Sequence, residues 1–479
     1  MNRFKNLSTT NKFDKDPSQD NFQSAEDDNG DEIDSEISED ETDSSEGDNE
    51  RENGSEISEN NFKYEASSTE NESEDEEVDS ITTLLAAAPS DCSWTQHFRP
   101  LFVHEFQPSK KCINVLPSSP AQTFRGLFSD QIFNLILEQT NIYGRKKYEK
   151  AESTISWTDV TQAELEQFLG INIIMGYSKN PSVDSYWSTD ASLRNEKIST
   201  TMACKNFKRI LESLHLVDNS KSKANIDLQS DKLIKVKHFL ELLLHNFQIH
   251  FDLKKNLTID EMMIKFKGRC SFKQYIKSKS IKRGYKVWVL ADALTGYVYN
   301  FQIYTGKSAE RQKPLGEHVV WSLTRELSMR FHHIYFDNFF ASPLLVEQLL
   351  EDGIYCTGTI RTNRKGIPAE LIRNIKMIRG EVKFLSKNSI SIVKWMDRKP
   401  VYIMSNFADP TKVKAITRSL KDGQKIEVNC PMMILDHNFG KVGVDRADQR
   451  IGIDLILGKT QLGGFYLVFG NIPFHFIPN

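Results

Sequence analysis

The chain has 479 residues, which is enough for two or three domains with cores of their own. Its net charge of −5 conceals two opposed regions, because residues 1–90 contain 28 acidic and 6 basic side chains whereas residues 91–479 contain 38 and 55. The sequence shows neither an apolar run of roughly 18 residues, as a membrane span needs, nor a signal-peptide core, so we expect a soluble, intracellular protein.

Residues 1–90 consist largely of Asp, Glu, Ser and Asn. Such a segment cannot bury enough apolar surface to offset its conformational entropy, so it is predicted to be disordered. A solvating tail is the simplest function for it. Two others stay open: phosphorylation of serines beside acids, such as Ser44 and Ser73, and competition with nucleic acid for the basic body.

Six cysteines are scattered through the rest of the chain, and no two stand at C-x-x-C spacing. The spacing therefore indicates neither a zinc module nor a disulfide framework, and a reducing compartment is expected. The excess of basic residues after residue 90 favours a polyanionic ligand, most often nucleic acid. A solvated basic surface without such a ligand is the alternative.

Apolar residues recur at helical spacing through residues 118–251, which predicts a mainly helical region. Thr161 and Glu164 stand at capping-box spacing and mark the start of one helix. No pattern here carries chemistry, so we interpret the apolar positions as core. Helices are expected at Ala121–Tyr143, from Thr161 to Met175, at Thr201–His215 and at Asp231–Phe251.

The stretch Asn256–Lys286 combines an acid in an apolar strand with a run of cations. Bulky and β-branched residues over Leu257–Phe266 predict the strand. Asp260 interrupts it, and a carboxylate costs free energy to bury unless a partner such as a bound cation compensates its charge. Residues 251–290 contain 11 Lys and Arg against 3 acids, so a polyanion track beside a metal site is predicted. The cations expected to line the DNA path are Lys265, Lys267, Arg269, Lys273, Lys277, Lys279, Lys282, Arg283 and Lys286.

Downstream, elements follow in the order β, β, β, α, β, α, β, which predicts an α/β domain. The apolar strand Phe331–Asp337 ends in an acid, and a helix beginning at Gly443 carries Asp445 and Asp448 three residues apart, hence on one face. Residues 366–430 are charged and strand-rich without a repeating βα unit, so we interpret them as an insertion. Further strands are expected at Lys286–Ala291, Gly296–Tyr304, Tyr355–Arg361, Glu381–Leu385, Ile390–Trp395 and Val401–Ser405, and helices at Gly316–Met329 and Pro343–Asp352.

Asp260, Asp337 and Asp445 are far apart in the sequence and can meet only in the tertiary fold. Three carboxylates together would hold two divalent cations, which activate a water and stabilise the leaving oxygen in phosphodiester cleavage. Mg²⁺ suits this chemistry because it takes few carboxylates and leaves positions for phosphate oxygens, with Mn²⁺ as the substitute. A single Asp at a strand end is more often a turn or cap residue, and that interpretation stays open for each.

Three segments resemble the signature blocks of the piggyBac transposase family: Leu257–Phe272 (LTIDEMMIKFKGRCSF), Tyr335–Leu344 (YFDNFFASPL) and Val442–Gln449 (VGVDRADQ). The resemblance covers roughly residues 98–450 and includes Phe168–Trp187. It implies an RNase H-like catalytic domain split by an insertion, together with a helical dimerisation and DNA-binding domain. It also implies Mg²⁺-dependent cutting and pasting of DNA at TTAA sites, through hairpin ends.

On the matching positions, Asp260, Asp337 and Asp445 are the expected catalytic acids, and Asp448 is a further expected metal ligand. Asp292 stands in a family-like strand but receives no metal role. The expected fold class is α/β, with an RNase H-like domain interrupted by a β-rich insertion and preceded by a mainly helical domain and a disordered acidic N-terminus. The expected domains are 1–90 (acidic tail), 91–256 (helical), 257–365 and 431–455 (catalytic), 366–430 (insertion) and 456–479 (a truncated or diverged C-terminal segment).

The resemblance implies double-stranded DNA as partner, in the form of transposon ends and TTAA targets, and also a homodimer, a nuclear location and no membrane. After Gln449 the family's basic helix with paired Trp and its Cys-rich zinc module are not matched. A decayed or domesticated DNA-binding protein without catalysis is therefore the alternative to an active transposase. A glycosidase with paired carboxylates is a third class of function, and the run of cations in residues 251–290 argues against it.

Overall fold

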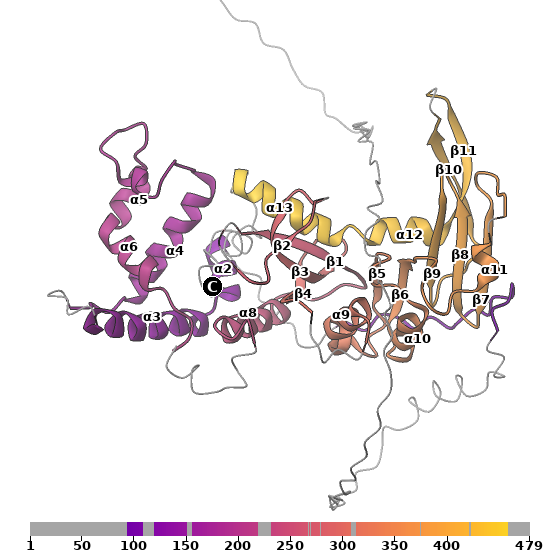
Figure 1. Ribbon diagram of the computed structural model, residues 1–479, viewed down its shortest axis with the longest axis horizontal. Coiled ribbons are helices and arrows are strands. Elements are labelled where there is room, and N and C mark those ends of the chain that lie inside the picture. The colour runs from indigo at the N-terminus through magenta and orange to yellow at the C-terminus, as the bar shows by residue number, and fades with distance from the viewer. Residues whose placement is uncertain are drawn as a thin grey trace, which may run out of the picture. The chain divides into compact units, whose positions relative to one another are not determined.

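A computed structural model describes ten stretches of the chain, and Figure 1 shows how their elements are arranged. The predicted acidic tail, Lys267, Arg269 and most of the predicted C-terminal segment lie outside these stretches. Among the described residues, no helix is both long and apolar enough to cross a membrane. The described residues are 93–108, 119–150, 156–218, 231–266, 268, 270–277, 279–307, 313–373, 375–420 and 423–457.

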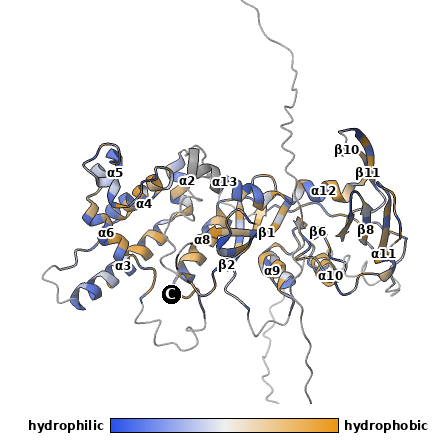
Figure 2. Ribbon diagram, turned by 45° about the horizontal axis from the view of Figure 1, so that its top comes forward, coloured by the Kyte–Doolittle hydropathy of each residue, from blue (hydrophilic) through white to orange (hydrophobic). Residues whose placement is uncertain are grey.

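The first half of the described chain is helical, as its apolar periodicity predicts. Thr161 and Glu164 form the predicted capping box, with Thr161 Oγ1 accepting from the Glu164 backbone and the Glu164 carboxylate accepting from the Thr161 backbone. Figure 2 shows hydrophobic residues along α4 and α8 and hydrophilic ones at the far end of α3. The helices are α2 (Pro120–Leu127), α3 (Asp130–Lys150), α4 (Gln162–Tyr177), η1 (Asp184–Trp187), α5 (Glu196–Thr201), α6 (Cys204–Ser213) and α8 (Lys237–Ile249).

The single helix predicted over Ala121–Tyr143 is in fact two, α2 and α3. Phe128 adopts a non-helical backbone and buries its ring. Asn246 of α8 makes this break tolerable, because its side-chain amide donates to Leu127 O at 2.9 Å and to Ser129 Oγ at 3.1 Å. A tertiary contact therefore supplies hydrogen bonds to polar groups that lack a partner within the helices. The sequence pattern of α2 and α3 alone does not predict this contact.

A nine-stranded mixed sheet forms the second half, in the order β2-β3-β1-β5-β6-β9-β8-β7, with β4 paired to β3. β1, β5 and β6 run parallel and the other pairs are antiparallel. The predicted βββαβαβ order is present, with the short strand β2 as an addition that the sequence did not predict. The strands are β1 (Asn256–Lys265), β2 (Gln274–Tyr275), β3 (Arg283–Asp292), β4 (Val298–Ile303), β5 (His333–Phe336), β6 (Tyr355–Thr359), β7 (Val382–Lys387), β8 (Ile390–Met396) and β9 (Pro400–Ser405).

The segment interpreted as an insertion contributes strands to this same sheet. β9 pairs antiparallel with β6, through Thr357 and Ser405, and β8 and β7 continue outward from it. A separate two-stranded ribbon, β10 (Val413–Ser419) and β11 (Lys425–Pro431), was not expected from the sequence. Helices α9 (Leu315–Thr324), η3 (Arg325–Leu327), α10 (Pro343–Glu351), α11 (Ala369–Ile372), α12 (Met432–Gly440) and α13 (Gly443–Leu457) accompany the sheet.

Residues 93–108 pack with the sheet rather than with the helices that follow them in sequence. Thr95 bridges to Ser386 of β7, and the His104 backbone amide donates to Tyr355 Oη at 2.9 Å. The His104 ring stacks on Phe331 with centroids 4.6 Å apart. Residues 93–108 therefore lie at the side of the sheet where β5 and β6 begin.

Alternate residues of β1 face two different cores, as the geometry of a strand requires. Leu257 and Ile259 belong to a core that includes residues of α9 and α10. Met262, on the opposite face, packs in a second core with Val444 of α13 and apolar residues of the helical region. Asp260 stands two residues before Met262 and therefore points to the same face of the sheet, which is the face that α13 covers.

Candidate active site

Strand pairing brings the first two predicted acids side by side. Ile259 of β1 pairs with Phe336 of β5 in parallel register, so Asp260, the next residue of β1, lies beside Asp337, which directly follows β5. Asp260 Oδ1 accepts a 2.7 Å hydrogen bond from the Glu261 backbone amide. Asp337 Oδ1 accepts one of 2.8 Å from the Phe339 amide, which is the turn-capping contact expected of an Asp at a strand end. Both acids therefore have one oxygen engaged by nearby backbone.

The connection between α12 and α13 is attached to the same two strands, one or two residues before the acids. Thr258 Oγ1 donates to Gly440 O and accepts from the Gly443 amide at 3.3 Å. His437 of α12 places Nε2 3.0 Å from Phe336 O. A Cβ on Gly443 would lie 2.7 Å from Thr258 Oγ1, so only glycine permits this approach.

This attachment sets the position of the two acids of α13. Val444 and Ala447 are buried against the sheet, which leaves Asp445 exposed and Asp448 half-buried one turn further on. Arg446 provides a further attachment, because its Nη1 donates to Ala293 O at 2.7 Å. Packing of α13 on β1 and β3 thus carries both acids to the face of the sheet that holds Asp260.

The carboxylates act on one another electrostatically. Burial raises the pKa of Asp260 to about 6, with repulsion from Asp337 and Glu261 adding to the rise. Burial also raises the pKa of Asp448 to about 7, with Asp445 and Asp260 adding to it. Although Asp337 keeps access to solvent, the surrounding protein atoms and Glu261 raise the pKa of its carboxyl. Acids from β1, the end of β5 and α13 therefore crowd one region, and a cation there would relieve the repulsion.

Lys279 is the cation that acts on three of these acids. Its Nζ donates to Glu261 O at 3.3 Å and lies 3.9 Å from Glu261 Oε1. It opposes the rise in pKa of Asp260, Asp337 and Asp448. The sequence predicted Lys279 for the DNA path along with its neighbours and did not distinguish it from them.

The acids offer carboxylate oxygens, the donors that Mg²⁺ and Mn²⁺ prefer. In the part of the chain that the structure describes, however, no three His, Cys, Asp or Glu side chains stand close enough together to hold a metal ion. The donor types thus fit a divalent cation, whereas a preassembled cage is not present among these residues. Binding would require the side chains to draw together.

The predicted DNA-path cations divide into two groups. Lys265, Lys277, Lys282 and Arg283 are exposed. Three others are engaged with the protein: Lys286 pairs with Glu261 at 2.9 Å, Lys273 donates to Gly268 O at 2.8 Å, and Lys279 contacts Glu261. Among the described cations, only the exposed group is placed on the surface as a DNA path requires.

Two arginines that sequence reasoning missed hold the loop after Asp337. Arg361 Nε donates to Asn338 Oδ1 at 2.8 Å, and Arg364 Nη2 donates to Phe339 O at 2.6 Å. The available signal was a pair of cations three residues apart directly after β6. Asp292, which received no metal role, is buried and caps the turn before β4, accepting from the Thr295 amide and hydroxyl at 2.7 Å each.

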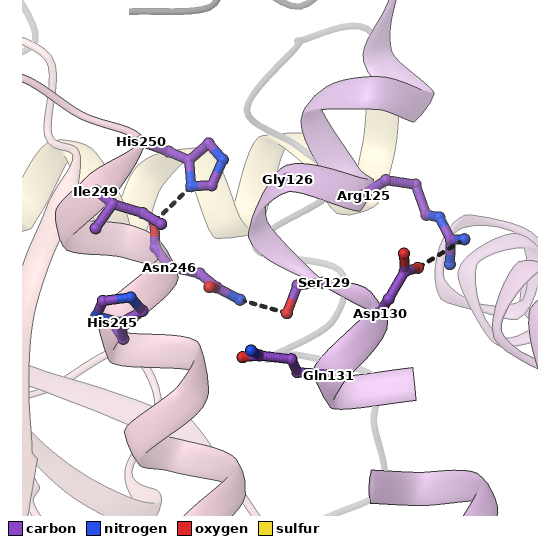
Figure 3. Close-up of a pocket in the computed structure, with 9 residues that line it drawn as sticks. All are labelled: Arg125, Gly126, Ser129, Asp130, Gln131, His245, Asn246, Ile249 and His250. Carbon is purple, nitrogen blue, oxygen red and sulfur yellow. Dashed lines mark hydrogen bonds and ion pairs between the residues drawn. The ribbon is translucent and has the colours of Figure 1, made fainter. Parts of the chain in front are cut away.

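An open pocket of about 500 Å³ lies elsewhere, between the α2–α3 junction and the end of α8 (Figure 3). Arg125 and Asp130 form an ion pair of 3.1 Å at one side, and His245 and His250 line the other. None of the predicted acids lines this pocket. It is a groove of the helical region, lined mostly by polar residues, and separate from the candidate active site.

Residues 119–452 match the family model described as Transposase IS4. Human PiggyBac transposable element-derived protein 3 is 29% identical over 348 residues, covering 70% of this chain and 56% of that protein. Human PiggyBac transposable element-derived protein 5 is 27% identical over 336 residues, covering 66% and 62%. The chain therefore spans less than two thirds of the length of either relative.

A solved structure is also similar: a piggyBac transposase synaptic complex with hairpin DNA, with a TM-score of 0.63, 25% identity and coverage of 78% of this chain and 77% of that one. The mixed α/β arrangement of sheet and helices agrees with that structure. The resemblance carried by the three sequence blocks is thereby confirmed. On the match over residues 119–452 and these relatives, the chain belongs to the Transposase IS4 family in its piggyBac-type form.

Proposed function

We propose that this chain is a metal-dependent DNA transposase that cuts and joins duplex DNA at transposon ends with TTAA targets. The observation that carries the proposal is the gathering of acids from three distant segments: Asp260 beside Asp337, with Asp445 and Asp448 brought over by the packing of α13. Membership of a transposase family supplies the reaction class.

In this proposal the four aspartates supply the metal-binding oxygens. When bound, Mg²⁺ or Mn²⁺ would supply Lewis-acid stabilisation of the phosphodiester oxygens and a more acidic water. The exposed cations Lys277, Lys282 and Arg283 hold the DNA backbone. Arg361 and Arg364 keep the loop after Asp337 in place. Lys279 offsets the charge of the acids within the site.

The proposal extends to architecture and setting. We assign β1 and β3–β6 with α9 and α10 to an RNase H-like catalytic domain, and β7–β11 to the insertion within it. The attachment of β9 to β6 supports this assignment, because the inserted strands begin where the catalytic sheet ends. A homodimer bound to double-stranded DNA in the nucleus belongs to the same proposal, on the family resemblance.

A DNA-binding protein without catalysis is the second candidate. Two observations favour it: among the described residues the acids do not stand at metal-ligand spacing, and Lys279 is bonded to Glu261 beside Asp260. In such a protein the exposed cations would bind DNA while Lys279 neutralised the acids permanently.

Strand cleavage separates these candidates. The full chain is incubated with labelled duplexes that carry candidate terminal repeats flanked by TTAA, in Mg²⁺, Mn²⁺ or EDTA. We expect cleavage in either metal, none in EDTA, and none by Asp260→Asn or Asp337→Asn, while all variants bind duplex in EDTA within about twofold of the parent because the phosphate contacts come from Lys and Arg. Glu427→Gln, at an exposed acid of β11, is the control and should cleave normally.

Duplex binding without cleavage in either metal would favour the second candidate. Cleavage that persists in Asp260→Asn would refute the assignment of the acids. Absence of DNA binding by the parent chain would contradict both candidates.

A further inference from the structure

The outer edge of the sheet carries an exposed aromatic side chain. Tyr275 is 59% exposed and lies on β2, the last strand of the sheet, paired with β3. Neighbouring aromatic residues behave differently: Phe272 and Tyr285 are buried and contact each other, and Phe266 stacks on Tyr285. This region therefore has an aromatic core of its own, from which Tyr275 is left out.

A cation stands over the Tyr275 ring. Arg283 is its cross-strand partner, and the guanidinium carbon lies 5.1 Å from the ring centroid. Such a cation–π contact holds the ring in one orientation. Lys277 and Lys282 are exposed close by in the sequence, and neither shows an ion pair among the described residues. An exposed ring among cations without partners is the arrangement that proteins use to bind nucleic acid bases and phosphates together.

The loop that follows Tyr275 leads directly to the candidate active site. The Ile276 amide donates to Lys282 O at 2.9 Å, which continues the pairing of β2 with β3 and closes a short loop between them. Lys279, within that loop, donates to Glu261 O, the residue after Asp260. Tyr275 thus stands at the base of a loop that contacts Glu261, the residue next to Asp260.

We propose that Tyr275, backed by Arg283, is a stacking platform for a nucleobase of unpaired DNA at the β2 edge of the sheet, which the loop carrying Lys279 connects to the acidic site. Bases inside a duplex are stacked on one another, whereas an unpaired base offers free faces to an aromatic ring. Stacking on one aromatic residue raises affinity by about 5- to 150-fold per base and is tolerant of sequence. The ligand class is therefore a duplex with an unpaired stretch. This inference rests on the proposed function.

The test compares two DNAs in EDTA, where no metal-dependent cleavage interferes. One is a fully paired duplex, and the other is the same duplex with a three-nucleotide unpaired tail that contains 2-aminopurine. Tyr275→Ser should lose about 5- to 150-fold in affinity for the tailed DNA and less than twofold for the duplex. Tyr275→Phe keeps the ring and should match the parent on both. Quenching of 2-aminopurine should occur with the parent and Tyr275→Phe and be lost in Tyr275→Ser.

Tyr177, at the end of α4, is a matched control because it is a tyrosine of 50% exposure in the helical region. Tyr177→Ser should leave both affinities and the quenching unchanged, and thermal melting verifies that each variant is folded. Equal losses on the two DNAs in Tyr275→Ser would overturn stacking in favour of a backbone contact, as would a loss in Tyr275→Phe. No binding of either DNA by the parent would instead contradict the proposed function.

Discussion

Lys279 Nζ donates a 3.3 Å hydrogen bond to the backbone carbonyl of Glu261 and lies 3.9 Å from Oε1 of the same residue. The other carboxylate oxygen of Glu261 is paired with Lys286 at 2.9 Å. Glu261 therefore keeps a partner if Lys279 is removed, whereas Asp260 and Asp448 lose the cation that opposes the rise of their pKa. Lys279 acts as the internal counter-charge of the acids.

Replacing Lys279 by Met should lower the free energy of unfolding by about 1 kcal/mol at pH 7.5, because the ionised acids then repel one another without compensation. The loss should shrink at pH 5, where Asp260 and Asp448 are largely protonated. Denaturant titration at both pH values measures it. Lys277→Met, at an exposed lysine of the same loop, should change the free energy of unfolding by less than about 0.5 kcal/mol. An equal loss at both pH values would show that Lys279 acts through packing.

Asp448 and Asp260 should make the metal-free protein less stable as pH rises. Their folded-state pKa values of about 7 and about 6 lie above the value of about 3.9 for an unfolded Asp, so between pH 4 and 7 the folded state binds more protons. Their stabilising contribution is complete below pH 4 and is lost as pH passes 6 and 7. Buried His332 and His437, whose pKa values are lowered to about 4, act in the opposite direction.

The difference between Asp448→Asn and the parent isolates the Asp448 contribution from that of the histidines. In EDTA, the variant should gain stability relative to the parent from pH 5 to about pH 7, and the gain should level off by pH 8. Denaturant melts across this range provide the measurement. A difference that stays constant with pH would mean that Asp448 titrates normally.

Divalent metal should raise the melting temperature of the parent at pH 7.5. Ligand at 100 times its dissociation constant stabilises the folded state by about 2.7 kcal/mol. The shift should disappear at pH 5, where protons compete for the acids. Asp337→Asn keeps an oxygen for the Phe339 amide but loses the charge, so it should retain stability in EDTA and lose the metal-induced shift. If Asp337 is only a turn residue, the metal-induced shift will survive this substitution.

Replacing Lys277, Lys282 and Arg283 together by Gln should weaken the salt dependence of DNA binding. Each lost phosphate contact reduces the slope of log affinity against log salt by about 0.9. Fluorescence anisotropy from 50 to 300 mM salt measures the slope. Because the three side chains are exposed, melting should be nearly unchanged. The same slope in a folded triple variant would remove these residues from the DNA path.

Gly443→Ala should destabilise the chain by about 1–3 kcal/mol, because the added Cβ would lie 2.7 Å from Thr258 Oγ1 and 2.9 Å from Asp292 O. It should also weaken metal-dependent stabilisation, since α13 carries Asp445 and Asp448. Gly170→Ala in α4 is the contrasting variant: nothing lies within 4 Å of its added Cβ, and it should stabilise by up to about 1 kcal/mol. Equal effects of the two substitutions would mean that α13 can shift without cost.

The sequence by itself determined which segments become helices and strands wherever periodicity is strong. The strand around Asp260, the helix capped by Thr161 and the alternation of strands and helices after Lys286 all follow from local patterns. It also drew attention to Asp260, since a charged residue in an apolar strand stands out without any knowledge of its neighbours, whereas the roles of Asp337, Asp445 and Asp448 came from the family resemblance. Whether these aspartates bind metal stays a prediction.

Tertiary structure alone decided the features that depend on contacts between distant segments. The break between α2 and α3 is stabilised by Asn246, which donates to Leu127 O from 119 residues away. Lys277 and Lys279 are identical residues two positions apart, and only the closure of their loop over β1 makes one a surface cation and the other a partner of Glu261. The sequence pattern of a helix or strand predicts which of its residues are buried. It does not predict which polar group from another segment will contact a given residue.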